Sequence, residues 1–214
     1  MFIQLLIAAL LTGSIYGLIA LGYSLIYKAS GIMNLSQGDL MCLGGFLGYT
    51  FYNLMNLPIW LTLICTVVCT FFIGCLLEKF VIRPIFKRKV STSALILATV
   101  AISYIVQSVE LVIWGGTPLR LKSFLSVPTI KIGGVIYQTE SLLCIGIAFL
   151  CMIALHIFMK KTSFGIAMRA AAMDQDAARS CGINVDATTR VTWAISVSVA
   201  GLAGILVGPL YGVT

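Results

Sequence analysis

The chain has 214 residues, of which 60% are hydrophobic and only 10% are charged, and its mean hydropathy is +1.06. These values exclude an ordinary water-soluble domain, and the length leaves room for about six bilayer-crossing helices of ~20 residues each. The net charge of +7 does not indicate a nucleic-acid partner, because the basic residues lie in short loops between apolar runs. The sequence therefore predicts an all-α polytopic membrane protein in contact with the lipid bilayer.

Six apolar segments are predicted as transmembrane helices from their hydropathy. In chain order they are Phe2 to Tyr27, Leu40 to Leu54, Ile59 to Leu77, Thr92 to Trp114, Leu142 to Met159 and Val191 to Leu210. The first is uncharged and too long for the core of a signal peptide, so we expect it to remain as the first span. The second is short and rich in glycine.

The charges of the loops predict the orientation. Residues 78–89 and residues 160–190 carry five lysines or arginines each, whereas residues 115–140 carry three. Because basic loops stay on the cytoplasmic side, we expect both of the more basic loops inside and the third loop outside. Counting back from these loops places the N-terminus outside.

The predicted outer loop contains the pattern of a β-hairpin. Apolar and polar residues alternate from Thr129 to Tyr137, around a Gly133-Gly134 pair that suits a two-residue turn. We therefore expect a short external β-hairpin on the outer membrane surface.

A polar stretch separates the first two apolar segments. Asn34, Ser36 and Gln37 supply uncharged hydrogen-bonding groups, and Asp39 supplies an acid. Polar backbone at membrane depth is tolerated where protein or water surrounds it, so these four residues are candidates for lining a translocation path in a re-entrant segment. An equally simple interpretation is a cytoplasmic turn in which Asp39 caps the second helix.

Pairs of glycines recur four residues apart, which places both on one side of a helix. Because lipid provides no hydrophobic drive between helices, close backbone contact at small residues supplies the attraction instead. The glycines expected to mediate helix packing are Gly13, Gly17, Gly44, Gly48, Gly204 and Gly208.

Ionisable residues within the spans are few. Gln107 and Glu110 lie one helical turn apart near the outer end of the fourth segment, where Glu110 is either functional or simply solvated at the interface. His156 has no nucleophile or carboxylate at a recognisable spacing, and no cysteine pair has the spacing of a metal site. We predict no catalytic residue, metal site or cofactor.

Residues 160–190 form the most informative loop. The stretch from Thr162 to Asn184 is rich in alanine and charge, and it is interrupted at Asp174. The Asp174 side chain can cap a second short helix that ends at Gly182, so we expect two short helices parallel to the membrane. An ordinary amphipathic connector is the alternative interpretation.

Two distant parts of the chain resemble one family, the permeases of branched-chain amino acid ABC transporters. In the C-terminal half, Phe164-Gly165, Arg169-Ala170, the stretch from Ala177 to Asn184 and the stretch from Ala200 to Gly204 resemble its cytoplasmic coupling segment and the following span. In the N-terminal half, the stretches from Tyr16 to Gly22, from Leu25 to Tyr27 and from Ile32 to Leu40 resemble the LivH-type subunit.

The resemblance implies a multi-pass subunit of an importer in the inner, or cytoplasmic, membrane. Its partners would be a second permease subunit, two cytoplasmic ATP-binding subunits and a periplasmic or extracellular substrate-binding protein. The cargo would be branched-chain amino acids or related amino acids and amides. The chain has no Walker-type phosphate-binding motif, so ATP hydrolysis is expected in a separate subunit and the chain itself is not expected to be an enzyme.

The resemblance also assigns residues 160–190 as the coupling loop that contacts the ATP-binding subunit. The residues expected to make or shape this contact are Phe164, Gly165, Arg169, Ala170, Ala171, Asp174, Ala177, Ala178 and Gly182. Family members normally continue with further spans, so residues 1–214 are expected to be a single permease domain that is incomplete at its C-terminus.

A secondary transporter or channel for a small polar solute is the main alternative. Such a protein needs ion-binding carboxylates or broken helices in symmetric halves. Only Asp39 and Glu110 are acids expected within the membrane.

Overall fold

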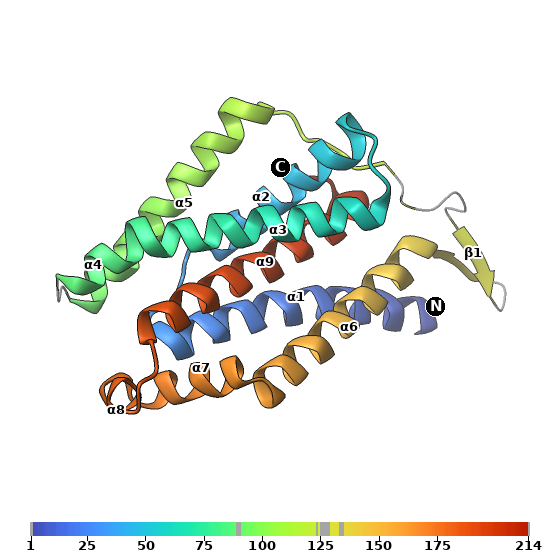
Figure 1. The fold of residues 1–214 in the computed structure, drawn as a ribbon. Coiled ribbons are helices and arrows are strands. Elements are labelled where there is room, and N and C mark those ends of the chain that lie inside the picture. The colour runs from blue at the N-terminus through green and yellow to red at the C-terminus, as the bar shows by residue number, and fades with distance from the viewer. Residues whose placement is uncertain (1, 89–90, 123, 125–128, 133–134, 214) are drawn as a thin grey trace.

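The computed structural model describes the chain except residues 1, 89–90, 123, 125–128, 133–134 and 214 (Figure 1). Its elements, with η for a π-helix, are α1 (Phe2–Ser30), α2 (Gln37–Tyr49), η1 (Thr50–Leu54), α3 (Ile59–Leu77), η2 (Glu78–Ile82), α4 (Arg83–Lys87), α5 (Thr92–Trp114), β1 (Thr129–Ile132), β2 (Val135–Gln138), α6 (Thr139–Lys161), α7 (Ser163–Met173), α8 (Gln175–Ser180) and α9 (Val185–Tyr211). Among the described residues, five helices are long and apolar enough to cross a membrane.

The five candidate spans include α9 and the helices built on α1, α3, α5 and α6. The second of the six predicted spans, Leu40 to Leu54, is helical as α2 and η1 but does not meet the same criteria, because it is short and contains polar residues. The prediction of six spans is therefore not supported. The third helix is longer than predicted, because α3 continues through η2 and α4 into the basic loop that was expected to begin at Glu78.

Helix α9 is the central helix of the bundle. It packs against α1, α2 and α3, and it lies between them in Figure 1. Small residues allow the close approach: a Cβ atom on Gly44 would collide with the backbone of Gly201, and one on Gly204 would collide with the carbonyl of Met41. The backbones of α2 and α9 therefore touch, which no larger side chain would permit.

The other predicted packing glycines differ from one another. A Cβ atom on Gly48 would meet Ile205, and one on Gly208 would meet Leu121, so both positions are crowded. By contrast, Gly13 has no described atom within 4 Å of such a Cβ, and Gly17 has only an ordinary contact at 3.5 Å with the Met152 sulfur. The packing role predicted for Gly13 and Gly17 has no counterpart within the described chain, because their side of α1 is not pressed against a neighbouring backbone.

Helix α3 shows how the bundle is arranged relative to lipid. Its buried side is a stripe of small residues at every fourth position, Thr62, Thr66, Thr70 and Gly74. A Cβ atom on Gly74 would lie 2.8 Å from the Ala194 Cα of α9, so this stripe faces the central helix. The large apolar side chains point outward instead, as lipid contact requires; examples are Trp60, Ile64 and Phe72.

The two basic loops lie at one end of the bundle. Figure 1 shows α4, α7 and α8 at this end, whereas the N-terminus and β1 lie at the opposite end. Strands β1 and β2 pair antiparallel, with Ile130 opposite Tyr137. The turn predicted at Gly133-Gly134 lies outside the described residues.

Candidate functional site

The loop between α6 and α9 is folded as two capped helices. The Thr162 hydroxyl accepts the Gly165 N–H at 3.0 Å and starts α7. The Asp174 carboxylate accepts the N–H groups of Asp176 and Ala177 at 2.9 and 3.0 Å, and so starts α8. The cap predicted at Asp174 is therefore confirmed, because a short acceptor side chain satisfies N–H groups that have no partner within the helix.

The second helix ends as its glycine predicts. Gly182 has a φ of +81°, a left-handed conformation that glycine adopts without a steric penalty. The Ile183 N–H then donates to the Ala178 carbonyl at 3.0 Å, which closes the end of α8. Asn184 accepts the Ala187 N–H at 3.0 Å and begins α9 directly afterwards.

Several of the residues predicted to couple the loop to an ATPase make contacts within the chain itself. Ala171 and Ala178 are buried in a small cluster with Val185, so they hold the loop together instead of lying on its outer surface. Arg169 donates to the Met159 carbonyl at the end of α6. A Cβ atom on Gly165 would lie 2.6 Å from the Phe158 carbonyl oxygen, so α7 packs tightly against α6.

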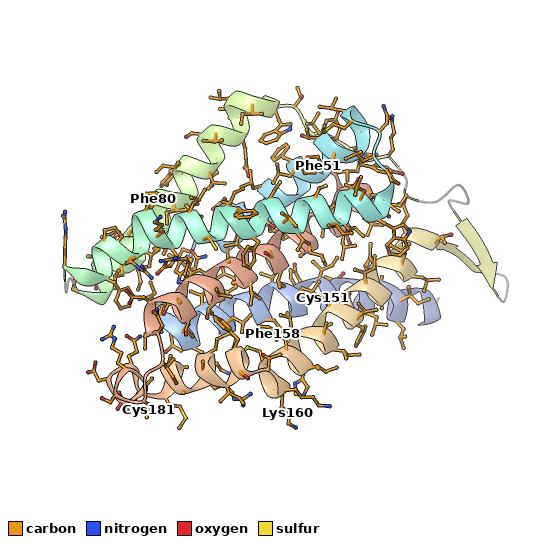
Figure 2. All side chains as sticks on the ribbon, viewed as in Figure 1. Phe51, Phe80, Cys151, Phe158, Lys160 and Cys181 are labelled. Atoms are coloured by element: carbon orange, nitrogen blue, oxygen red, sulfur yellow. The ribbon has the colours of Figure 1, made fainter. Side chains whose placement is uncertain are left out.

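Ala171 and Ala178 are therefore not placed to contact a partner directly. Both alanines lie on the side of the loop that must cover the chain's own apolar surface, so neither is free to enter a groove on another subunit. Phe164 and Ala170 are half-buried, whereas Ala177 is exposed. Met173 is 90% exposed at the end of α7, and it was not among the predicted residues. Figure 2 shows Cys181, also exposed, at the same end of the bundle.

A buried carboxylate organises the charges beside this loop. The Glu78 side chain, only 3% exposed, lies 3.3 Å from the Arg83 Nε and 3.4 Å from the Arg190 Nε. Arg83 also donates to the Asp186 carbonyl at 2.7 Å. These contacts tie η2 and α4 to the first turns of α9. This cluster is not among the features predicted from the sequence, although Glu78 is the only acid among residues 78–89.

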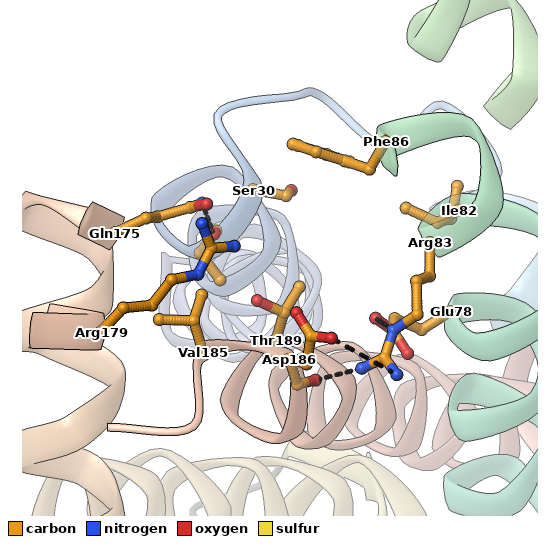
Figure 3. Close-up of a pocket in the computed structure, with 11 residues that line it drawn as sticks. Ser30, Glu78, Ile82, Arg83, Phe86, Gln175, Arg179, Val185, Asp186 and Thr189 are labelled. Atoms are coloured by element: carbon orange, nitrogen blue, oxygen red, sulfur yellow. Dashed lines mark hydrogen bonds and ion pairs between the residues drawn. The ribbon is translucent and has the colours of Figure 1, made fainter. Parts of the chain in front are cut away.

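A pocket of about 300 Å³ opens between the charge cluster and α8 (Figure 3). Arg83 and Glu78 lie on one side of it, and Gln175 and Arg179 of α8 lie on the other. Gln175 donates to the Ala29 carbonyl at 3.4 Å, near the end of α1. The pocket therefore lies where α1, η2, α4, α8 and α9 meet.

The polar stretch between α1 and α2 folds back into the bundle. The Gln37 amide donates to the Ser196 hydroxyl at 3.2 Å, and the Ser196 hydroxyl donates to the Gly22 carbonyl at 2.7 Å. Gly22 lies eight residues before Ser30, the last residue of α1, which corresponds to a depth of about 12 Å. The first residue of α2 therefore lies inside the bundle, below its surface.

The four candidate path residues have different surroundings. Asn34, Ser36 and Gln37 have no exposed surface, and the Asn34 amide donates to the Gln37 side chain at 3.1 Å. They join parts of the chain to one another and face no open space. Asp39 does not cap α2, because its carboxylate accepts hydrogen bonds from Ser103 and Gln107 of α5. No group of three potential metal ligands comes together among the described residues.

The chain matches the family described as "Branched-chain amino acid transport system / permease component" over residues 5–214. The high-affinity branched-chain amino acid transport system permease protein LivH of Salmonella typhimurium is 28% identical, across 99% of this chain and 72% of its own length. A probable branched-chain amino acid transport permease protein LivH of Methanocaldococcus jannaschii is also 28% identical, across 94% of this chain and 64% of its own length.

A third relative is the permease protein BraD of Pseudomonas aeruginosa, from a high-affinity branched-chain amino acid transport system. It is 24% identical, across 99% of this chain and 72% of its own length. No solved structure matches the chain. The family match covers almost the whole chain, so the chain belongs to the family of branched-chain amino acid transport system permease components.

Proposed function

We propose that the chain is the permease subunit of an ATP-dependent importer that moves branched-chain amino acids, or related amino acids and amides, across the inner membrane. The observation that carries this proposal is the family match over residues 5–214. The three relatives are all named as permease proteins of branched-chain amino acid transport. The expected partners are a second permease subunit, two ATP-binding subunits and an external substrate-binding protein.

In this proposal the basic end of the bundle faces the cytoplasm. The strands β1 and β2 then lie on the outer side, and α2 with η1 supplies a short sixth membrane segment. The native Cys181, which is exposed beyond α8, provides an internal probe. In intact cells a membrane-impermeant thiol reagent should spare Cys181 and label a Lys131→Cys variant. Labelling of Cys181 from outside would show that the orientation is reversed.

Coupling to the ATP-binding subunits is assigned to the outer surface of α7 and α8. The exposed residues there include Ile166, Arg169, Met173 and Ala177, whereas Ala171 and Ala178 are buried. A bulky or charged side chain at an exposed contact position would block docking without disturbing the fold of the loop.

The test uses the complete transporter in proteoliposomes, with substrate-loaded binding protein. Met173→Glu and Ala177→Trp should each reduce substrate-stimulated ATP hydrolysis and leucine uptake by about tenfold, corresponding to about 1.4 kcal/mol of lost contact. Cys181→Ser changes an exposed position on the same loop and should behave as the unmodified chain. Full stimulation in both variants would show that this loop is only a connector, and leucine uptake without any ATPase would favour a secondary carrier.

A further inference from the structure

A cavity of about 320 Å³ lies between α2 and α5, away from the pocket beside the coupling loop. Figure 1 shows α5 inclined away from the rest of the bundle, and within the described chain it packs mainly on α2 and η2. This volume is sufficient for a small solute. The side chains that matter for binding are the polar Asp39, Gln107 and Glu110 and the apolar Cys42, Phe46 and Leu111.

The apolar side of the cavity is held in place by aromatic packing. Phe46 stacks on Trp114, with ring centroids 5.2 Å apart and an interplanar angle of 23°. The Trp114 indole donates to the Thr50 hydroxyl at 2.8 Å, which fixes the ring. Phe46 is therefore a rigid surface against which a short aliphatic chain can pack.

The two carboxylates of the cavity differ in their hydrogen bonds. Asp39 accepts the Gln107 amide at 2.8 Å and also accepts the Ser103 hydroxyl. Glu110 is only 7% exposed, and its buried Oε1 accepts no hydrogen bond from the described residues. A buried acceptor without a donor is unfavourable, and an acid within a span is a functional candidate. Glu110 therefore has an unused acceptor beside a cavity of suitable size.

We propose that this cavity binds the ammonium group of the transported amino acid, with Glu110 as the principal acceptor and Asp39 as a second negative charge. An ammonium group has three N–H donors and one positive charge, so it can supply the hydrogen-bond donor that Glu110 Oε1 does not have among the described residues. The branched side chain would pack on Phe46 and Leu111. The proposal rests on the proposed transport function, and it adds the site within the membrane at which the solute is bound.

The first test compares two matched substitutions. Glu110→Gln keeps the shape of the side chain and removes its charge. The control is Glu140→Gln on α6, where the carboxylate is also buried but already accepts the Phe124 N–H at 2.9 Å, away from the cavity. In the complete transporter, Glu110→Gln should raise the KM for leucine uptake at least tenfold while the complex still assembles. Glu140→Gln should leave KM within twofold.

The second test detects binding directly at Cys42, a native thiol in the cavity wall. The small cationic reagent 2-aminoethyl methanethiosulfonate should modify Cys42, as measured by mass spectrometry of the Cys42 peptide. Leucine and 3-methylbutylamine should slow this modification at least fivefold, whereas 4-methylpentanoate, which lacks the ammonium group, should not. Glu110→Gln should abolish the protection, and Glu140→Gln should preserve it.

The outcomes separate the site from the transport function. Absence of leucine uptake by the unmodified transporter would contradict the proposed function, whatever happens at Cys42. With uptake intact, the site proposal is overturned if Glu110→Gln leaves KM and protection unchanged, or if 4-methylpentanoate protects as well as leucine. It is also overturned if Cys42 is not modified at all, because a cavity closed to this reagent is closed to leucine.

Discussion

Helices α9 and α6 are both apolar candidate spans, yet they occupy opposite environments. In the most apolar stretch of α9, 78% of the residues are buried within the chain, compared with 11% in α6. The buried side chains of α9 are mostly small, as at Ala200 and Ala203, whereas α6 presents Leu150 and Ile153 to the outside. Both lipid and a protein interior accept apolar side chains, so hydropathy does not distinguish the two helices. The size and hydrogen bonding of the side chains distinguish the inner helix from the outer one.

The largest expected effect comes from a side chain that forces α9 and α2 apart. Gly204→Leu places a side chain where the Met41 carbonyl already lies, and backbone cannot yield as a flexible side chain can. We expect loss of monodisperse protein in detergent, measured by fluorescence-detected size-exclusion chromatography. The matched control is Gly146→Leu on α6, where an added Cβ meets no described atom within 4 Å. Equal recovery of both variants would contradict the central position of α9.

Shortening an apolar side chain should destabilise the protein on α9 but not on α6. Ile205 of α9 has no exposed surface, so Ile205→Ala should leave a cavity and destabilise the protein by about 2–5 kcal/mol. Leu150 of α6 is 70% exposed, so Leu150→Ala should change stability by less than about 0.5 kcal/mol. Thermal unfolding of the two variants in one detergent gives the comparison. A larger loss for Leu150→Ala would reverse the assignment of inner and outer helices.

A smaller effect is expected where α9 is hydrogen-bonded to the first residue of α2. Gln37→Ala removes the donor to Ser196 and the acceptor for Asn34, leaving buried polar groups without partners. We expect a loss of about 1–3 kcal/mol in unfolding free energy. Ser108→Ala on α5 serves as the control, because that exposed hydroxyl donates to the Tyr104 carbonyl of its own helix. A denaturant titration that shows no difference between the two would contradict the structural role of Gln37.

The features readable from the sequence are those decided by nearby residues. The five long apolar helices, the cap at Asp174 and the left-handed Gly182 each depend on signals within a few residues. The sequence places Gly13 and Gly204 in similar patterns, but only the latter faces another backbone. That difference depends on which side of each helix meets a neighbour, and the spacing of glycines along one helix does not specify it.

The candidate sites were harder to predict for the same reason. Gln37 bonds to Ser196, 159 residues later, and Glu78 bonds to Arg190, 112 residues later. The sequence identified the polar stretch around Gln37 but not whether its side chains line a space or join helices. The contact with Ser196 of α9 decides this, and that residue is far away along the chain.

The fold of the α7 and α8 loop has a mechanical consequence. Arg169 joins α7 to the last turn of α6, and the cluster of Ala178 and Val185 joins α8 to the start of α9. The loop is thus ordered by its own chain, so a partner that docks on it pays little conformational entropy for ordering it. A displacement of the loop would therefore displace both helices to which it is joined, α6 on the outside of the bundle and α9 at its centre.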